Sequence, residues 1–148
     1  MKIAMGSDHG GFNLRHKVKA HLEAKGYEVV DFGVDEPVSC DYPDYALKVA
    51  LAITEGSCDL GVLVCGTGLG ISIAANKVKG IIAAPVSDTF SAEMARRHNN
   101  ANILALGERV VGEGLALKIV DAFFEASFEG GRHESRVNKI VAIEKKYL

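Results

Sequence analysis

The chain has 148 residues, 48% of them apolar and 24% charged, so we expect a single domain over residues 1–148 that buries its own core. Its formal net charge of -2, with acidic and basic residues mixed, gives no broad basic surface for nucleic acid or an anionic membrane. No signal peptide and no apolar run of about 18 residues is found, so we expect no membrane contact and a soluble cytoplasmic protein.

Strand-like and helix-like patterns alternate along the chain. Short apolar runs are typical of strands buried on both faces, and the stretches between them carry apolar residues at helical spacing. This alternation predicts a parallel sheet with helices on both faces. The predicted strands are 2–7, 27–32, 60–64, 81–86 and 103–106; the predicted helices are 12–25, 45–54, a short one after Gly70, 89–97, 113–126 and 134 to the C-terminus.

Ligands of such sheets bind beyond the carboxyl ends of the strands, which here are followed by loops 8–11, 65–68, 87–88 and 107–109. Glycines at 66, 68 and 70 allow backbone N–H groups to turn inward and form a pocket for negative charge. A dinucleotide site would need glycine in place of Ile71, and a P-loop would need Gly-Lys-Ser/Thr, so nucleotide binding is disfavoured.

Several side chains near these loops could carry chemistry, although each also has a structural interpretation. Cys65 ends a strand just before the glycine loop and could act as a thiolate base, yet a free cysteine is usually a core residue. Asp8 could bind substrate or cap a helix, and His98 could transfer protons or cap the helix before it. Arg132 and Arg136, four residues apart, could clamp a phosphate or form a solvated face.

Metal and disulfide chemistry are not indicated. The five histidines lack the spacing of a zinc motif, and the three cysteines form no C-x-x-C pair. We therefore expect no metal and no cofactor. Proton transfer between C1 and C2 of a sugar would use a base, N–H groups for the enediolate oxygen and an acid/base for ring opening, all of which are candidates here.

Five motifs stand out along the chain: Gly6-Ser7-Asp8-His9-Gly10-Gly11, Asp41-Tyr42-Pro43, the stretch from Cys65 to Lys77, Arg97-His98-Asn99 and Glu129-Gly130-Gly131-Arg132-His133. These motifs resemble those of the ribose-5-phosphate isomerase B family, which includes galactose-6-phosphate and allose-6-phosphate isomerases. The resemblance runs almost end to end, and its motifs are far more specific than an isolated glycine loop.

The resemblance implies a Rossmann-like three-layer αβα sandwich that interconverts ribose 5-phosphate and ribulose 5-phosphate in the non-oxidative branch of the pentose phosphate pathway. It also implies a homodimer or a dimer of dimers with active sites at the dimer interface. By this resemblance, Cys65 is the proton-transferring base, and Thr67 and His98 open the sugar ring. The backbone of Gly66, Gly68 and Gly70 holds the enediolate, and Asp8 and Asn99 bind sugar hydroxyls. The phosphate ligands are His9, Arg132, Arg136 and, less clearly matched, Arg109.

Some residues depart from the family pattern. A family branch without the cysteine uses a glutamate further on, but here Cys65 is present and residues 72–76 contain no glutamate. Gly10 stands where alanine or valine is common, and Ile82 and Pro85 lie in a stretch that often reads Arg-Ala. The preferred sugar therefore stays open between five and six carbons.

The sequence leaves two alternative functions open. One is an allose-6-phosphate or galactose-6-phosphate isomerase. The other is a non-catalytic small-molecule-binding module of flavodoxin-like architecture, which would rest only on the fold and the glycine loop. A receiver-like signalling domain is disfavoured because residues 107–109 do not supply the lysine expected after the last strand.

Overall fold

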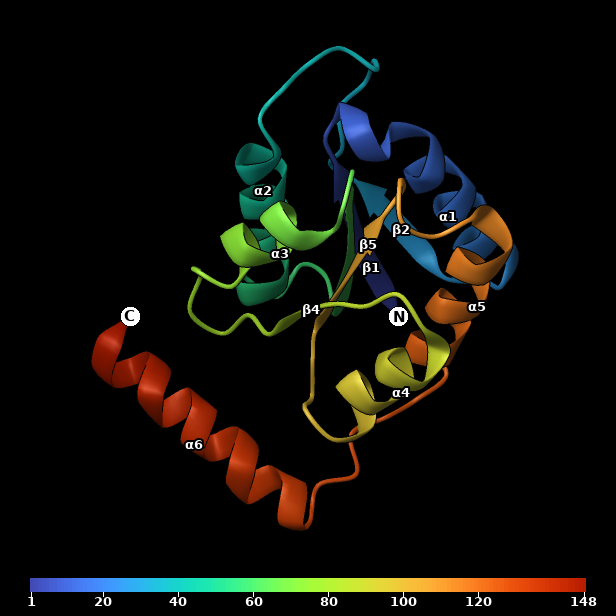
Figure 1. The fold of residues 1–148 in the computed structure, drawn as a ribbon. Helices are drawn as coiled ribbons and strands as arrows, with labels where there is room; N and C mark the ends of the chain where they lie inside the picture. The colour runs from blue at the N-terminus through green and yellow to red at the C-terminus, as the bar shows by residue number, and fades with distance from the viewer.

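The computed structural model describes residues 1–148 around one five-stranded sheet (Figure 1). All neighbouring strands are parallel and stand in the order β2-β1-β3-β5-β4. The predicted five-stranded parallel sheet is confirmed. Its strands are β1 (Lys2–Ser7), β2 (Glu28–Asp31), β3 (Leu60–Cys65), β4 (Ala83–Pro85) and β5 (Ile103–Gly107).

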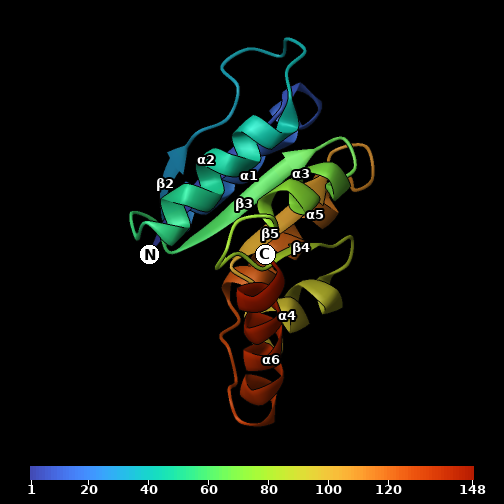
Figure 2. The same ribbon diagram turned by 90° about the vertical axis from the view of Figure 1, so that its left-hand side faces the viewer.

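Helices cover both faces of the sheet, which confirms the three-layer αβα sandwich (Figures 1 and 2). Along β3, Leu60, Val62 and Val64 pack toward one face, while Leu63 and Cys65 pack toward the other. This alternation creates two cores because successive strand residues point in opposite directions. The first core is covered by α1 (Phe12–Ala24), α4 (Thr89–Arg97) and α5 (Glu113–Phe124); the second is covered by α2 (Tyr42–Thr54) and α3 (Leu69–Ala75).

Element ends differ from the predicted ranges for local reasons. Helix α2 begins three residues earlier than predicted, since Pro43 lies in its first turn, where a missing N–H leaves no bond unmade. Strand β4 has three residues instead of six, and just before it the N–H of Ile82 donates to the side chain of Asn102 at 2.8 Å.

The last helix, α6 (Arg132–Tyr147), projects away from the sandwich in both views (Figures 1 and 2). Only His133 and Val137 of this helix are buried, whereas Ile143 and Tyr147 are 62% and 74% exposed. It begins two residues before the predicted start. No helix in the structure combines the length and apolarity required to cross a membrane.

Candidate functional site

Cys65 lies at the carboxyl end of β3 with its sulfur enclosed by the glycine loop. The residue is 5% exposed, and the N–H of Gly68 donates to its Sγ at 3.1 Å. Gly68 has φ +78°, and a Cβ there would lie 2.9 Å from the carbonyl carbon of Leu106. Glycine is therefore required for the turn that directs this N–H at the sulfur.

The loop after β1 lies directly against the Cys65 loop. Asp8 is 7% exposed, and its Oδ1 accepts a hydrogen bond from the N–H of Gly10 at 2.9 Å. A Cβ at Gly10 would lie 3.1 Å from the Gly66 nitrogen and 3.2 Å from Asp8 Oδ1. The departure to glycine at position 10 thus relaxes a tight approach between the two loops.

Arg109 also belongs to this group. The backbone N–H of Arg109 donates to the Gly66 carbonyl at 3.0 Å, and a Cβ on Gly66 would be 3.6 Å from Arg109 Nη1. Thr67 is exposed beside it, with Oγ1 accepting from the N–H of Leu69 at 3.2 Å. The structure therefore brings together a thiol, a hydroxyl, a carboxylate and a guanidinium where the parallel strands have their carboxyl ends, here called the carboxyl edge of the sheet; the amino edge is the opposite one.

His9 has a defined hydrogen-bonding role in the same group. Its Nδ1 accepts from the N–H of Cys40 at 3.3 Å, so the proton of the neutral ring lies on Nε2, which is free to donate to an anion. The phenol of Tyr45 lies near this pair, and burial together with the Cys40 thiol raises the pKa of Tyr45. Cys40 was assigned no role from the sequence, because nothing in its loop marks contact with His9.

A second residue without a predicted role is Tyr42, whose ring lies over the glycine loop. A Cβ on Gly70 would be 2.6 Å from Tyr42 Cζ, so glycine is needed for this approach. A cavity of about 250 Å³ opens beside Thr67, and Pro85 lines it together with Val86 and Ser87. Ile82 and Pro85 were the two residues near β4 that depart from the family pattern. Pro85 borders the candidate site, whereas Ile82 does not line this cavity.

The predicted catalytic histidine, His98, belongs to a separate group, in which two imidazoles share one carboxylate. His98 and His133 stack with ring centroids 4.0 Å apart and an interplanar angle of 8°. Their Nε2 atoms lie 3.8 Å and 3.6 Å from Glu129 Oε1. Arg97 binds the other carboxylate oxygen, Oε2, at 2.6 Å. Asn99, Arg132 and Arg136 are exposed and flank this group in the sequence.

The charges of this histidine group act on one another. Burial opposes ionisation of Glu129, but Arg97, His98 and His133 together lower its pKa, so it is anionic near neutral pH. Burial is the main cause that lowers the pKa of His133, followed by the positive charges of His98 and Arg132, while Glu129 acts in the opposite direction. The neutral form of His133 is thus favoured.

His98, Glu129 and His133 place possible metal-ligand atoms within 4.8 Å of one another, which the sequence spacing did not indicate. Arg97 already binds the Glu129 carboxylate, and the charges of Arg132 and Arg136 act on the same histidine. These three cations disfavour a metal ion here and favour an anion such as phosphate.

Within one chain, the two groups lie at opposite edges of the sheet. Strands β3 and β5 pair so that Cys65 faces Gly107 at the carboxyl edge and Gly61 faces Ile103 at the amino edge. His98 precedes β5 and so lies beyond the amino edge. Gly61 and Cys65 are four residue steps apart along β3, which at about 3.3 Å per step is about 13 Å. One chain therefore does not bring His98 to Cys65.

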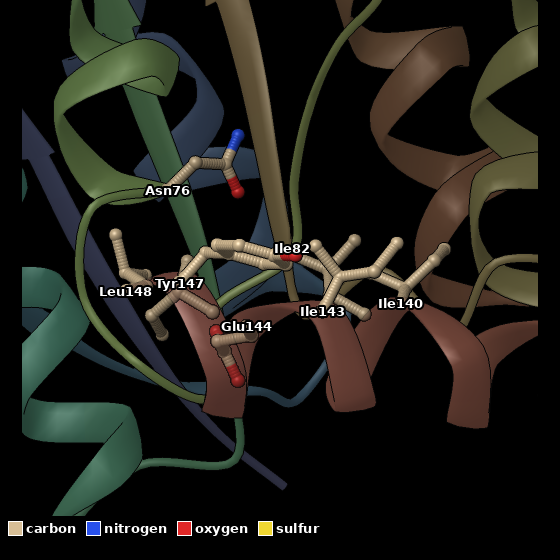
Figure 3. Close-up of a pocket in the computed structure, with 8 residues that line it drawn as sticks. Asn76, Ile82, Ile140, Ile143, Glu144, Tyr147 and Leu148 are labelled. Atoms are coloured by element: carbon tan, nitrogen blue, oxygen red, sulfur yellow. The ribbon is translucent and has the colours of Figure 1, made fainter.

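The C-terminal half of helix α6 borders an open apolar groove (Figure 3). The groove has a volume of about 360 Å³. Ile140, Ile143 and Tyr147 of the helix face Ile82 across it, and the helix is tied to the body there by Gly80, whose N–H donates to Glu144 Oε1 at 3.0 Å. An exposed apolar surface of this kind is typical of a protein interface.

Comparison with known proteins points to one family. Residues 3–140 match the model of the Ribose/Galactose Isomerase family. The chain is 54% identical over 145 residues to ribose-5-phosphate isomerase B of Escherichia coli K12, covering 98% of this chain and 97% of that protein.

Solved structures agree with this match. Ribose-5-phosphate isomerase B of Clostridium thermocellum is 60% identical, with a TM-score of 0.98 and complete coverage of both chains. The enzyme of Mycoplasma genitalium with bound ribulose-5-phosphate is 46% identical, with a TM-score of 0.94 and coverage of 98% and 97%. The chain therefore belongs to the Ribose/Galactose Isomerase family, within its group of ribose-5-phosphate isomerases B.

Proposed function

We propose that the chain interconverts ribose 5-phosphate and ribulose 5-phosphate through an enediolate, with residues 1–148 acting as one isomerase domain in the cytoplasm. The observation that carries the mechanism is the buried Cys65 sulfur at the carboxyl edge of the sheet, which accepts a hydrogen bond from the backbone N–H of Gly68 in the glycine loop. The bound ribulose-5-phosphate of the Mycoplasma genitalium relative supports a sugar phosphate as the ligand.

In this mechanism Cys65, as the thiolate, removes the proton from C2 of the open-chain aldose and returns it to C1. The negative charge on the enediolate oxygen is stabilised by the N–H groups of residues 66–70. Thr67 and His98 move protons during ring opening, and Asp8 and Asn99 bind sugar hydroxyls. No step uses a metal or cofactor.

Phosphate recognition is assigned to His9, Arg132 and Arg136, with Arg109 as a further ligand. His9 is prepared for this role by its Nε2 proton, because Nδ1 accepts from Cys40. Arg132 and Arg136 lie in the first turns of α6 and stay exposed in the single chain. Guanidinium groups bind phosphate oxygens in pairs of hydrogen bonds, which suits this part of the ligand.

We infer further that two chains together build each site, as a homodimer or a dimer of dimers. The Cys65 group of one chain and the His98 group of another would supply complementary chemistry, and neither group is complete alone. The exposed apolar side chains of α6 support this arrangement, since a second chain would cover surface that one chain leaves in water (Figure 3).

The sugar preference can be tested by measuring isomerisation of ribose 5-phosphate and allose 6-phosphate side by side in the presence of a metal chelator. We expect turnover of ribose 5-phosphate that the chelator does not change. Faster turnover of allose 6-phosphate would instead favour a six-carbon enzyme, and Pro85 beside the Thr67 cavity would then be the first residue to exchange. Turnover that the chelator abolishes would contradict the metal-free mechanism.

Replacing Arg136 with alanine should weaken substrate binding more than turnover. A charge-assisted hydrogen bond contributes about 1.5–3 kcal/mol, which corresponds to an increase in KM of about 10- to 100-fold. Steady-state kinetics with ribose 5-phosphate measures both constants. Lys145→Ala, which removes a positive charge from the far end of the same helix, is the control and should leave KM unchanged. An unaltered KM in Arg136→Ala would remove this residue from the phosphate site.

A further inference from the structure

Glu129 contacts the end of α4 and two histidines, and it lies just before α6. The proposed mechanism requires these parts to keep fixed relative positions. Its Oε2 accepts from Arg97 Nε at 2.6 Å, and its backbone N–H donates to the Arg97 carbonyl at 3.0 Å. Both its side chain and its backbone are thus fixed to the end of α4. Its Oε1 meanwhile faces His98 Nε2 at 3.8 Å and His133 Nε2 at 3.6 Å.

Glu129 also lies at the base of α6. Gly130 and Gly131 follow with φ of +69° and +55°, and the helix begins at Arg132. The N–H of His133 then donates to the Gly130 carbonyl at 3.0 Å, which closes this turn. The turn at Gly130 and Gly131, directly after Glu129, therefore sets the direction of α6 from its first residue, Arg132.

The stacked imidazoles make the charge of Glu129 important. Positive charges on two rings with centroids 4.0 Å apart would repel one another. His133 is the more buried ring, and burial and its cationic neighbours favour its neutral form. Glu129, which is anionic, offsets the repulsion at both rings.

We propose that Glu129 is a positioning residue for ring opening: held by Arg97, its carboxylate fixes the stacked rings of His98 and His133 relative to the first turn of α6. This inference rests on the proposed role of His98 in ring opening. Glu129 itself is not expected to touch the reacting atoms.

The reaction allows ring opening to be separated from proton transfer. Ribose 5-phosphate is cyclic, so its conversion requires the ring to open. Ribulose 5-phosphate carries phosphate on the oxygen that would close a five-membered ring, so it is open-chain. Exchange of its C1 hydrogen with deuterium from solvent therefore needs the Cys65 step but not ring opening.

The experiment compares Glu129→Gln with wild type and with Glu125→Gln. The glutamine variant keeps an oxygen that can accept from Arg97 but loses the negative charge. Glu125 is an exposed carboxylate four residues earlier that pairs with Lys25 at 3.4 Å, so its variant is a matched control. We expect Glu129→Gln to slow net conversion of ribose 5-phosphate by about 10-fold or more and to change deuterium exchange into ribulose 5-phosphate by less than about two-fold. Glu125→Gln should change neither rate.

A second measurement follows the imidazole of His133 by NMR during a pH titration. Because Glu129 raises the pKa of His133, its removal should lower that pKa further, whereas Glu125→Gln should not. Glu129→Asp, which keeps the charge but shortens the reach, should recover part of the conversion rate.

Equal loss of conversion and exchange in Glu129→Gln would overturn the proposal and indicate a role in folding or assembly. Unchanged conversion would overturn it as well. His98→Ala separates this failure from failure of the mechanism: it should show the same selective loss as Glu129→Gln. If His98→Ala loses both rates equally, the assignment of ring opening to His98 is wrong, and the proposal for Glu129 fails with it.

Discussion

Cys65→Ala should lose isomerisation by about 100- to 10,000-fold while keeping its fold, because removal of a positioned base typically has this effect. The sulfur lies where the N–H of Gly68 meets the end of β3, and no other thiol shares this loop. Deuterium exchange into ribulose 5-phosphate should fall by the same factor, since it requires the same base. Circular dichroism and thermal unfolding would report that the sandwich is retained.

Cys58→Ala is the matched control for this experiment. Cys58 is likewise 5% exposed, but it lies before β3, at the opposite edge of the sheet, where burial raises the pKa of its thiol and disfavours the thiolate. This variant should lose some stability through the lost packing and keep its activity. Full activity in Cys65→Ala would show that a different group is the base. Loss in both variants would point to a packing effect.

The alternation of apolar runs and helical patterns was enough to predict the sheet and its layers. The run at 60–64 is buried on both faces, as a central parallel strand requires, and Cys65 extends it by one residue. Helix ends were less predictable because single residues decide them locally, as Pro43 does in the first turn of α2. The α6 helix was predicted, but its position away from the sandwich was not, since only His133 and Val137 of this helix are buried.

The resemblance named the candidate site residues and implied sites at a dimer interface, but it did not say which residues form which group. The parallel sheet itself carries that information, since a residue that precedes a strand lies at the amino edge, as His98 does before β5. By contrast, nothing in the sequence indicated that Tyr42 would lie over Gly70 or that Glu129 would face two histidines. These contacts join segments that are distant in sequence or turned by glycines of positive φ.

Mixing two inactive variants should restore activity if each site is built from two chains. In a dimer of one Cys65→Ala chain and one His98→Ala chain, one site combines both lesions and the other combines the intact Cys65 with the intact His98. A purified heterodimer should therefore have about half the activity of wild type, and a randomly exchanged equal mixture about one quarter. Activity would be measured with ribose 5-phosphate before and after subunit exchange.

The control pairs two lesions from the same edge of the sheet, Cys65→Ala and Asp8→Asn. Asp8 lies with Cys65 in the loops that meet at Gly10 and Gly66, so every site of this heterodimer contains one lesion. It should stay inactive while the first pair recovers. If neither pair recovers although heterodimers form, each site lies within one chain. His98 would then be too far from Cys65 to act on the same sugar, because the sheet holds them about 13 Å or more apart.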